Sequence, residues 1–423
     1  MQFKKTVLSN GLRVITVPMP DSATSTVLVL VEAGSEYETK EINGLSHFLE
    51  HMCFKGTTRR PTALTIAHEL DMLGASFNAF TSTDHTGYYA KAINSNFPQI
   101  LDLISDLYLN PIFEVAEIEK ERGVIIEELN MYEDLPMEKV HSILQNSMYG
   151  DQPAGWDIGG TKEVITKLNR EDFIKYRSER YIAENTVVVV AGGVDEKETI
   201  EAVDKAFNKM VVGKRISKLA TVISDSGPRV SIKAKPLDQA HIALGFKAYD
   251  ISNPRRFALE VLSTYLGEGM SSRLFTVVRE ELGAAYRISS GVNLGLDHGE
   301  FIISAGLNLQ KLSVVLQAVF KECKALRDNP LPADKLDETK RKLIGKFPVN
   351  LDTSDALAAY FGSQEVDSGE VMTIEEETKK YLAVTAEEVQ KAASEVFRNN
   401  NLSLAVVSPM ENGEALQPLL SVE

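Results

Sequence analysis

The stretch HELDMLGASFNAFTSTDHTGYYAKAI, residues 68–93, has a counterpart in REELGAAYRISSGVNLGLDHGEFIISAGL, residues 279–307. Each contains Leu-Gly-Ala, starting at Leu73 and Leu282, followed by an aromatic residue, an Asp-His pair and an apolar run. An apolar helical pattern that ends in Asn-Pro comes after each of them. The two copies are about half of the chain apart, and such an ordered series indicates two homologous domains.

The predicted domains cover residues 1–215 and 228–423, with the boundary in the polar stretch KRISKLATVISDSGP. A chain of 423 residues is long enough for two domains of about 200 residues each. Runs of β-branched residues predict strands, and helical periods predict helices. The predicted strands are 12–18, 25–34, 185–193, 229–234, 240–246, 299–307 and 401–408; the predicted helices are 62–73, 97–109, 114–132, 310–326 and 333–346. Because these elements do not alternate strictly, we predict α+β domains, each a largely antiparallel sheet packed with helices.

The composition narrows the class of protein. A net charge of −15 argues against nucleic acid or an anionic membrane as a partner. The sequence contains no apolar run of the length that predicts a membrane helix, so we expect no membrane association. The two cysteines, Cys53 and Cys323, fit a reducing compartment, and the N-terminal residues lack the pattern of a secretory signal or a transit peptide. We therefore expect a cytoplasmic protein.

A possible metal site lies in NGLSHFLEHMCFKGT, residues 43–57, which predicts a helix capped by Asn43. His47 and His51 are four residues apart and share a face of that helix, which Glu50 also reaches. Zinc prefers histidine and carboxylate ligands, and a catalytic site keeps one position open. The alternative is a polar patch on an ordinary helix. The residues around the trio are apolar, however, and buried histidine and glutamate need partners, which favours a metal.

A third ligand is best sought in EVAEIEKERGVIIEELNMYEDLP, residues 114–136. Glu121 and Glu128 are two helical turns apart on one face, and Glu127 lies on a different face. The spacing alone does not choose between Glu127 and Glu128. Gly123 costs this helix about 1 kcal/mol relative to alanine. One interpretation of this glycine is close packing against the first helix.

The segment from His47 to His51, followed by MCFKGT, resembles the inverted zinc motif of the pitrilysin-type metallopeptidases, which include insulin-degrading enzyme and the mitochondrial processing peptidase. The resemblance covers the whole chain, through LSNGLRVI, LGASFNAFTSTDHTGYY, ERGVIIEELNMYED, GMSSRLF and REELGAAY. It is best to the short, two-domain bacterial members. The chain departs from the family at Gln152, where histidine is more common, and at Glu268, where glycine is more common. Neither position is a metal ligand.

The resemblance implies that His47, His51 and Glu128 hold one zinc ion per chain. It also implies that Glu50 is the catalytic base and that Glu121 supports a ligand histidine. The implied activity is that of a zinc-dependent endopeptidase. The alternative is a non-catalytic or partner-dependent subunit of a heteromeric processing peptidase, and an amidase that uses the same metal is a third reading. The presence of every implied ligand and of the base argues against a non-catalytic role.

The resemblance also implies a substrate peptide bound in extended form. It would lie along the strand that contains Asn78, Ala79 and Phe80, and contact Arg279 and Tyr286 of the second domain. Without the resemblance, we would interpret Arg279 as an ordinary surface residue and Tyr286 as a core residue. In the family, two such halves close around an unfolded peptide. For a chain of this length, that implies a homodimer in which Arg279 and Tyr286 act in trans.

Overall fold

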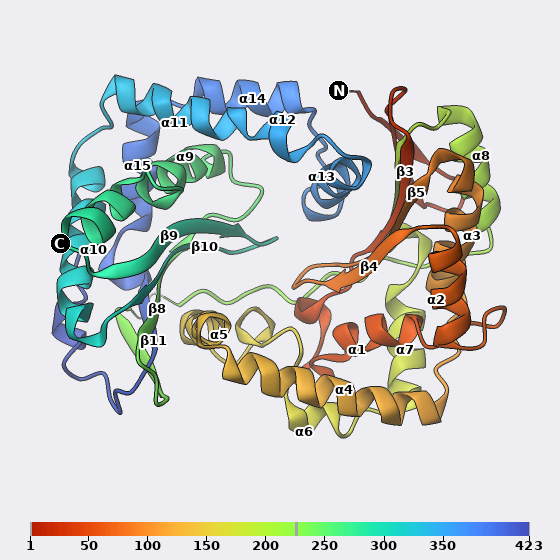
Figure 1. Ribbon diagram of the computed structural model, residues 1–423, viewed down its shortest axis with the longest axis horizontal. Helices are drawn as coiled ribbons and strands as arrows, with labels where there is room; N and C mark the ends of the chain where they lie inside the picture. The colour runs from red at the N-terminus through yellow and green to blue at the C-terminus, as the bar shows by residue number, and fades with distance from the viewer. Residues whose placement is uncertain (1, 225–226, 423) are drawn as a thin grey trace. The chain divides into compact units, whose positions relative to one another are not determined.

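The computed structural model describes residues 2–224 and 227–422, which form two compact units (Figure 1). The first unit contains the chain up to Leu129, Asp157–Leu219 and Phe347–Glu375; the second contains Asn130–Trp156, Ala220–Lys346 and the chain from Glu376 onward. These units differ from the predicted halves, 1–215 and 228–423, because each includes a segment of the other half. Residues 225 and 226 of the predicted boundary stretch lie outside the described residues.

The first unit is built on a six-stranded sheet. In spatial order its strands are β1 (Lys4–Val7), β2 (Arg13–Pro18), β6 (Thr186–Gly192), β3 (Thr24–Val31), β5 (Thr86–Ile93) and β4 (Ser76–Thr81). Only the β2 and β6 pair is parallel. Within the described chain β4 is therefore an edge strand.

The second unit is built on a five-stranded sheet. In spatial order its strands are β7 (Arg229–Ala234), β11 (Leu402–Ser408), β8 (Ala240–Ala248), β10 (Gly299–Leu307) and β9 (Ala285–Leu294). Only the β7 and β11 pair is parallel, so this sheet repeats the order and directions of β2, β6, β3, β5 and β4. The prediction of two largely antiparallel sheets packed with helices is confirmed.

Helices cover both sheets. Those of the first unit are α1 (Leu45–Cys53), α2 (Ala63–Met72), α3 (Phe97–Leu109), most of α4 (Val115–Asp134), α6 (Lys162–Ile165), α7 (Arg170–Arg180), α8 (Glu196–Phe207), α12 (Phe347–Asn350) and α13 (Ser354–Asp367). Those of the second unit are α5 (Pro136–Tyr149), α9 (Arg256–Gly267), α10 (Leu312–Asp328), α11 (Ala333–Gly345), most of α14 (Ile374–Ala383) and α15 (Ala386–Val396). The five helices predicted from their helical periods correspond to α2, α3, α4, α10 and α11 and differ from them by at most two residues at either end, and the helix predicted within 43–57 is α1.

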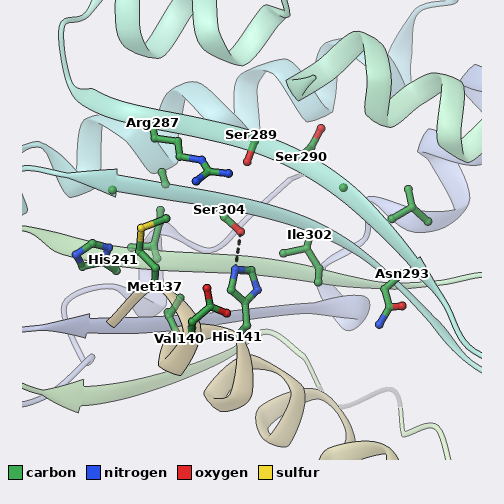
Figure 2. Close-up of a pocket in the computed structure, with 16 residues that line it drawn as sticks. Met137, Val140, His141, His241, Arg287, Ser289, Ser290, Asn293, Ile302 and Ser304 are labelled. Carbon is green, nitrogen blue, oxygen red and sulfur yellow. Dashed lines mark hydrogen bonds between the residues drawn. The ribbon is translucent and has the colours of Figure 1, made fainter. Parts of the chain in front are cut away.

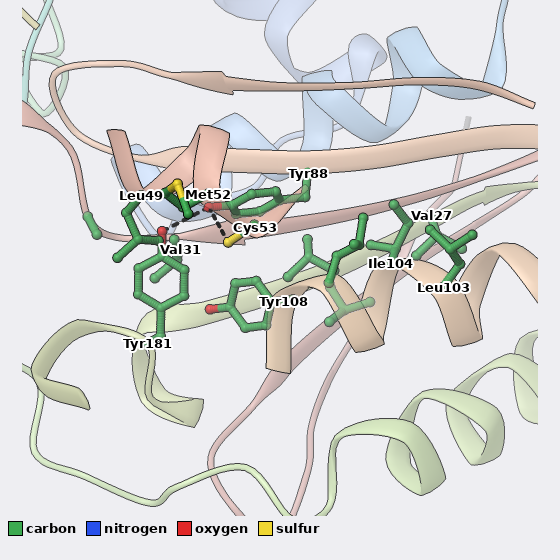
Figure 3. Close-up of a cluster of buried hydrophobic side chains, with 14 of the residues drawn as sticks. Val27, Val31, Leu49, Met52, Cys53, Tyr88, Leu103, Ile104, Tyr108 and Tyr181 are labelled. Carbon is green, nitrogen blue, oxygen red and sulfur yellow. Dashed lines mark hydrogen bonds between the residues drawn. The ribbon is translucent and has the colours of Figure 1, made fainter. Parts of the chain in front are cut away.

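The main core of the first unit lies between its sheet and helices α1, α3, α7 and α8. Figure 3 shows the part behind α1, where Cys53 donates a hydrogen bond to the Tyr88 hydroxyl at 3.5 Å. That hydroxyl lies 3.0 Å from the hydroxyl of Tyr181. Phe48, Leu49 and the rest of the apolar face of α1 are buried in the same core. The apolar face of α1 therefore holds the helix against the sheet, and the opposite face is left for polar side chains.

Each unit includes one segment from the other half of the sequence, and we call these two the exchanged segments. Each of them places a helix against a sheet formed largely by the other half of the chain. Helix α13 packs on β3 and β6, where a Cβ at Gly362 would lie 2.7 Å from Leu30 Cδ1. Helix α5 packs on β8 and β11, where a Cβ at Gly245 would lie 2.7 Å from the Met148 sulfur. A glycine thus permits close approach at both contacts.

None of the helices in the described part of the chain is both long and apolar enough to span a membrane.

Candidate metal centre

Helix α1 is held at its start by Glu38, which precedes it in the chain. The Glu38 carboxylate accepts the backbone N–H of Gly44 at 2.7 Å and that of Ser46 at 2.6 Å. Gly44 is the capping residue and has a φ of 96°, so the prediction that Asn43 caps the helix is wrong. Asn43 donates its side-chain amide to Glu38 instead. Burial raises the pKa of Glu38 to about 7.

His47 and His51 lie side by side on the face of α1 that is turned away from the core. Their ring centroids are 4.7 Å apart, with the planes inclined at 73°. Burial, with a smaller effect of His51, lowers the pKa of His47 to about 4, so this imidazole is neutral at pH 7. A neutral imidazole has the free nitrogen lone pair that a metal requires.

The third member of the cluster is Glu128 of α4. Its Oε2 lies 3.7 Å from Nε2 of His47 and 3.7 Å from Nε2 of His51. Glu127 is exposed on another side of α4, so only Glu128 meets both imidazoles. The suggested close packing at Gly123 is wrong, because a Cβ there would have nothing within 4 Å.

Glu121 lies outside this three-residue cluster and forms a hydrogen bond with His51. His51 Nδ1 and Glu121 Oε1 are 2.8 Å apart, and because a carboxylate accepts, the imidazole donates. The other carboxylate oxygen, Oε2, lies 2.5 Å from Nζ of Lys55. Burial acts to raise the pKa of Glu121, but the hydrogen bonds with His51 and Lys55 outweigh it and lower that pKa overall.

Glu50 is the carboxylate of α1 that stays outside the three-residue cluster. Its Oε2 accepts a hydrogen bond from the Thr81 hydroxyl at 2.7 Å, at the end of β4. Burial raises the pKa of Glu50, and the hydrogen bond from Thr81 opposes this rise. The carboxylate is thus fixed between α1 and the edge strand, beside the histidines.

The donor set of His47, His51 and Glu128 fits a zinc ion. Tetrahedral zinc with ligands at 2.0–2.2 Å places neighbouring ligand atoms roughly 3.3–3.5 Å apart. The observed separations of 3.7 Å are close to this, and all three ligand atoms lie within 4.8 Å of one another. Two imidazole nitrogens and one carboxylate are also the ligand types of a catalytic zinc site.

A cavity of about 380 Å³ opens beside this cluster, between the end of α1, helix α2 and strand β4. Glu50, His51, Lys55 and Glu121 lie along one part of its wall. The rest of the wall is largely apolar and includes Phe54, Ala63, Ile66, Ala67 and Phe77. The site therefore combines a polar cluster with room for an apolar side chain.

Strand β4 carries the three residues predicted to bind substrate in this unit. The side-chain oxygen of Asn78 accepts the backbone N–H of Ala79 at 3.0 Å. Asn78 and Ala79 line the cavity, whereas Phe80 is partly exposed and lies edge-on to His85. The backbone of an edge strand beside the cavity can pair with an added strand.

Arg279 and Tyr286 belong to the second unit. Arg279 lies in η6 (Phe275–Glu281), a π-helix, and its guanidinium is 5.4 Å from the centroid of the Tyr286 ring. Tyr286 is 78% exposed near the start of β9, so its interpretation as a core residue is wrong. The two side chains form a cation–π pair in which Tyr286 is exposed and Arg279 is half-buried, with its guanidinium also 4.8 Å from the Phe275 ring centroid.

The second unit also has a cavity of about 330 Å³, between α5 and strands β8, β9 and β10 (Figure 2). Its polar lining includes His141, whose Nε2 lies 3.2 Å from the hydroxyl of Ser304. Among the described residues that line it, no three offer ligand atoms close enough together to hold a metal. The described lining of this cavity therefore differs from the His47, His51 and Glu128 cluster of the first unit in its capacity to hold a metal.

Fold and site together are those of a metallopeptidase of the inverted zinc-motif type. The chain belongs to peptidase family M16: residues 13–162 match insulinase (peptidase family M16), and residues 167–343 match the peptidase M16 inactive domain. The cofactor is zinc. The match of residues 167–343 to an inactive domain agrees with the lack of a second His-x-x-Glu-His sequence there.

Relatives over nearly the full length are zinc proteases by name. An uncharacterized zinc protease of Bacillus subtilis is 32% identical over 97% of this chain and 99% of that protein. Another, of Streptomyces coelicolor, is 31% identical over 97% of this chain and 91% of that protein.

Solved structures share the fold. A protease from Helicobacter pylori has a TM-score of 0.89 at 24% identity, covering 96% of this chain and 99% of the other. A peptidase M16 inactive domain from Pseudomonas fluorescens has a TM-score of 0.89 at 17% identity, covering 97% and 99%.

Two residues that contact the site were not predicted. Thr81 lies on the same face of β4 as Phe77 and Ala79, and the period of two residues along a strand could have placed it beside Glu50. Lys55 follows His51 by four residues, so the helical period could have placed it on the same side. Glu38 has no such signal, because its contact with α1 depends on the path of the intervening loop.

Proposed function

We propose that this protein is a zinc-dependent endopeptidase that hydrolyses unfolded peptides bound in extended form. The observation that carries the proposal is the position of Glu50. Its carboxylate lies between the His47, His51 and Glu128 cluster and the edge strand β4. A base at that position can reach a water molecule between a metal and a peptide laid along the strand.

Each residue of the site has a separate role in the proposed hydrolysis. His47, His51 and Glu128 hold one zinc ion per chain, which when bound polarises the peptide carbonyl and makes the attacking water more acidic. Glu50 takes a proton from the attacking water and passes it to the leaving amine as the peptide C–N bond breaks. Glu121 orients His51 through its Nδ1–H.

The substrate backbone binds to the edge strand. The segment that contains Asn78, Ala79 and Phe80 pairs with an added strand through the main-chain groups that face away from β5, those of Ala79, and such bonds tolerate many sequences. The N–H of Ala79 donates to the Asn78 side chain, so a peptide that pairs with this N–H has to displace that side chain. The apolar cavity beside Glu50 accepts the side chain of a residue next to the cleaved bond, which favours bulky apolar residues there.

We further propose that the active protein is a cytoplasmic homodimer. Arg279 and Tyr286 of one subunit act in trans on the substrate carbonyl at the zinc centre of the other. The exposure of Tyr286 in this pair supports a role in contacts outside their own unit. Free, buried Cys53 and Cys323 agree with a reducing compartment.

The test is digestion of a mixture of unstructured peptides, with the products identified by mass spectrometry. The protein is assayed as purified, after removal of metal with a chelator, and after zinc is restored. We expect cleavage that is lost on chelation and recovered with zinc, with bulky apolar residues enriched next to the cut sites.

The second candidate is a non-catalytic or partner-dependent subunit of a heteromeric processing peptidase. It would bind zinc and peptides yet leave the mixture uncut under all three conditions. The complete set of Glu50, His47, His51 and Glu128 favours the catalytic alternative.

A further inference from the structure

Glu121 is anchored at both oxygens of its carboxylate. Oε1 bonds to His51 Nδ1 at 2.8 Å, and Oε2 lies 2.5 Å from Lys55 Nζ. The Glu121 side chain is only 7% exposed, so the ion pair is largely shielded from water. A carboxylate held at one oxygen can still rotate, whereas one held at both keeps its plane and direction.

Lys55 reaches Glu121 because the helical turn of α1 continues past its last residue. The backbone N–H of Phe54 donates to the His51 carbonyl at 3.1 Å, and that of Lys55 donates to the Met52 carbonyl at 3.1 Å. These bonds to the third residue back form a tightened turn of the 3₁₀ type, and it leaves Lys55 on the same side as His51, since both side chains contact Glu121. A single turn therefore supplies both the His51 imidazole and the Lys55 ammonium that contact Glu121 on α4.

The other charges around the site indicate the role of the ion pair between Lys55 and Glu121. Glu50, Glu121 and Glu128 place three carboxylates around the two imidazoles. A largely buried carboxylate needs a partner of opposite charge or a full set of hydrogen bonds. The Lys55 ammonium provides that partner for Glu121, which lies outside the cluster of His47, His51 and Glu128.

We propose that Lys55 is a positioning residue of the zinc centre, which acts by holding Oε2 of Glu121 so that Oε1 orients His51. Partners one step removed from the metal, such as Glu121, typically change metal affinity or activity by 10- to 100-fold, and Lys55 acts through this partner. The proposal rests on the zinc site of the proposed function, although not on the identity of the substrate.

The test compares Lys55→Met with Lys55→Arg in the full chain. Methionine keeps the length of the side chain without the charge, and arginine restores a cation. The control is Lys120→Met, since Lys120 precedes Glu121 on α4 but is 70% exposed and pairs with Glu117. The first readout is the zinc dissociation constant from competition with a fluorescent chelator. The second is the separate change of kcat and KM at saturating zinc.

We expect Lys55→Met to weaken zinc binding about tenfold and to lower kcat more than it changes KM. Lys55→Arg should recover most of both, and Lys120→Met should behave as wild type. In a Glu121→Gln background, Lys55→Met should have little further effect on zinc affinity, because the two residues act through one contact.

Unchanged zinc affinity in Lys55→Met, or full additivity with Glu121→Gln, would overturn the proposal. So would an equal loss in Lys120→Met, which would reveal a general effect of charge. If Lys55→Met does not fold, Lys55→Gln is measured in the same way. A wild type that binds zinc but cuts no peptide would refute the proposed function, while the zinc affinities would still decide the role of Lys55.

Discussion

The hydroxyl of Thr81 donates a hydrogen bond to Glu50, the residue that we propose as the catalytic base. Thr81 donates to Glu50 at 2.7 Å and stabilises the ionised carboxylate against the effect of burial, which raises its pKa. Glu50 must be ionised to accept a proton, so kcat/KM rises as the pH passes through its pKa.

Replacing Thr81 by valine should therefore raise the pKa of Glu50. A hydrogen bond to a charged group contributes about 1.5 kcal/mol, which corresponds to about one pKa unit. We expect the acid limb of the kcat/KM profile of Thr81→Val to move up by about one pH unit, with zinc affinity unchanged. The check is the pH profile of both proteins, and Thr81→Ser, which keeps the hydroxyl, is the control. An acid limb that stays in place would contradict this role of Thr81.

At the residue scale, the sequence pattern predicts which side chains come together at the site. It predicts less well which further residues form hydrogen bonds with them. The i, i+4 spacing placed His47 and His51 together, because a helix imposes that geometry locally. The choice between Glu127 and Glu128 needed the resemblance, because it depends on how α4 is rotated against α1. Glu38 was missed for a similar reason, since its contacts form only when the loop before α1 folds back.

At the element scale, helix α2 and strand β4 form the walls of the apolar cavity. Replacement of Ala67 by tryptophan should fill much of this cavity from the side of α2, while all three proposed metal ligands are kept. Excluding a large apolar side chain costs about 1.5–3 kcal/mol of binding, or roughly 10- to 100-fold in kcat/KM. We expect that loss for peptides with a bulky apolar residue next to the cut, and little change for those with alanine there.

The matched control for this cavity is Leu64→Trp. Leu64 lies on the same helix but is 79% exposed, so this variant places a tryptophan on α2 outside the cavity. Kinetics on paired peptides that differ at one position give the comparison. Equal losses for large and small residues in Ala67→Trp would show that the cavity does not select the substrate.

Helix α4 offers a test of stability through Gly123. This residue is exposed within the helix, and a Cβ there would meet nothing within 4 Å. Gly123→Ala should therefore raise the free energy of unfolding by about 1 kcal/mol. Gly44→Ala provides the contrast, since Gly44 has a φ of 96° and its Cβ would lie 2.6 Å from the Gly159 carbonyl oxygen. Urea unfolding of both variants is the measurement, and a destabilised Gly123→Ala would contradict the expectation.

The elements themselves were largely predictable where their periods are strong. The predicted helices 97–109 and 333–346 match α3 and α11 because their apolar residues repeat at the helical spacing. The π-helix η6 was not predictable, since it widens a helix without a distinct pattern of residues. The start of α1 was misjudged, because a buried carboxylate outside the helix replaces the side-chain cap.

At the scale of the whole molecule, the repeat of strand order and the α+β class followed from the sequence, but the exchange of segments did not. Helices α5 and α13 pack on β8 and β3, strands that belong to the opposite halves of the sequence. Their apolar faces predict burial and do not specify which sheet provides it. Local sequence patterns therefore do not predict the contacts between residues far apart in the chain.

The proposed dimer predicts complementation between two inactive variants. If Arg279 acts in trans, a mixed dimer of Glu50→Gln and Arg279→Ala has one site with both groups intact. Mixing the two after subunit exchange should restore activity to a sizeable fraction of wild type, although each alone is nearly inactive. Fluorogenic peptide assays before and after exchange provide the measurement. Activity no greater than the sum of the separate variants would argue against action in trans.

The central claim, that Glu50 is the base of a zinc peptidase, is tested most directly by comparing wild type with Glu50→Gln at equal zinc content. Zinc per chain is measured by elemental analysis, and kcat on a peptide that the wild type cuts. The account predicts one zinc per chain in both proteins and a loss of about 10²- to 10⁴-fold in kcat for the variant. A Glu50→Gln protein that cuts peptides as fast as wild type would contradict it.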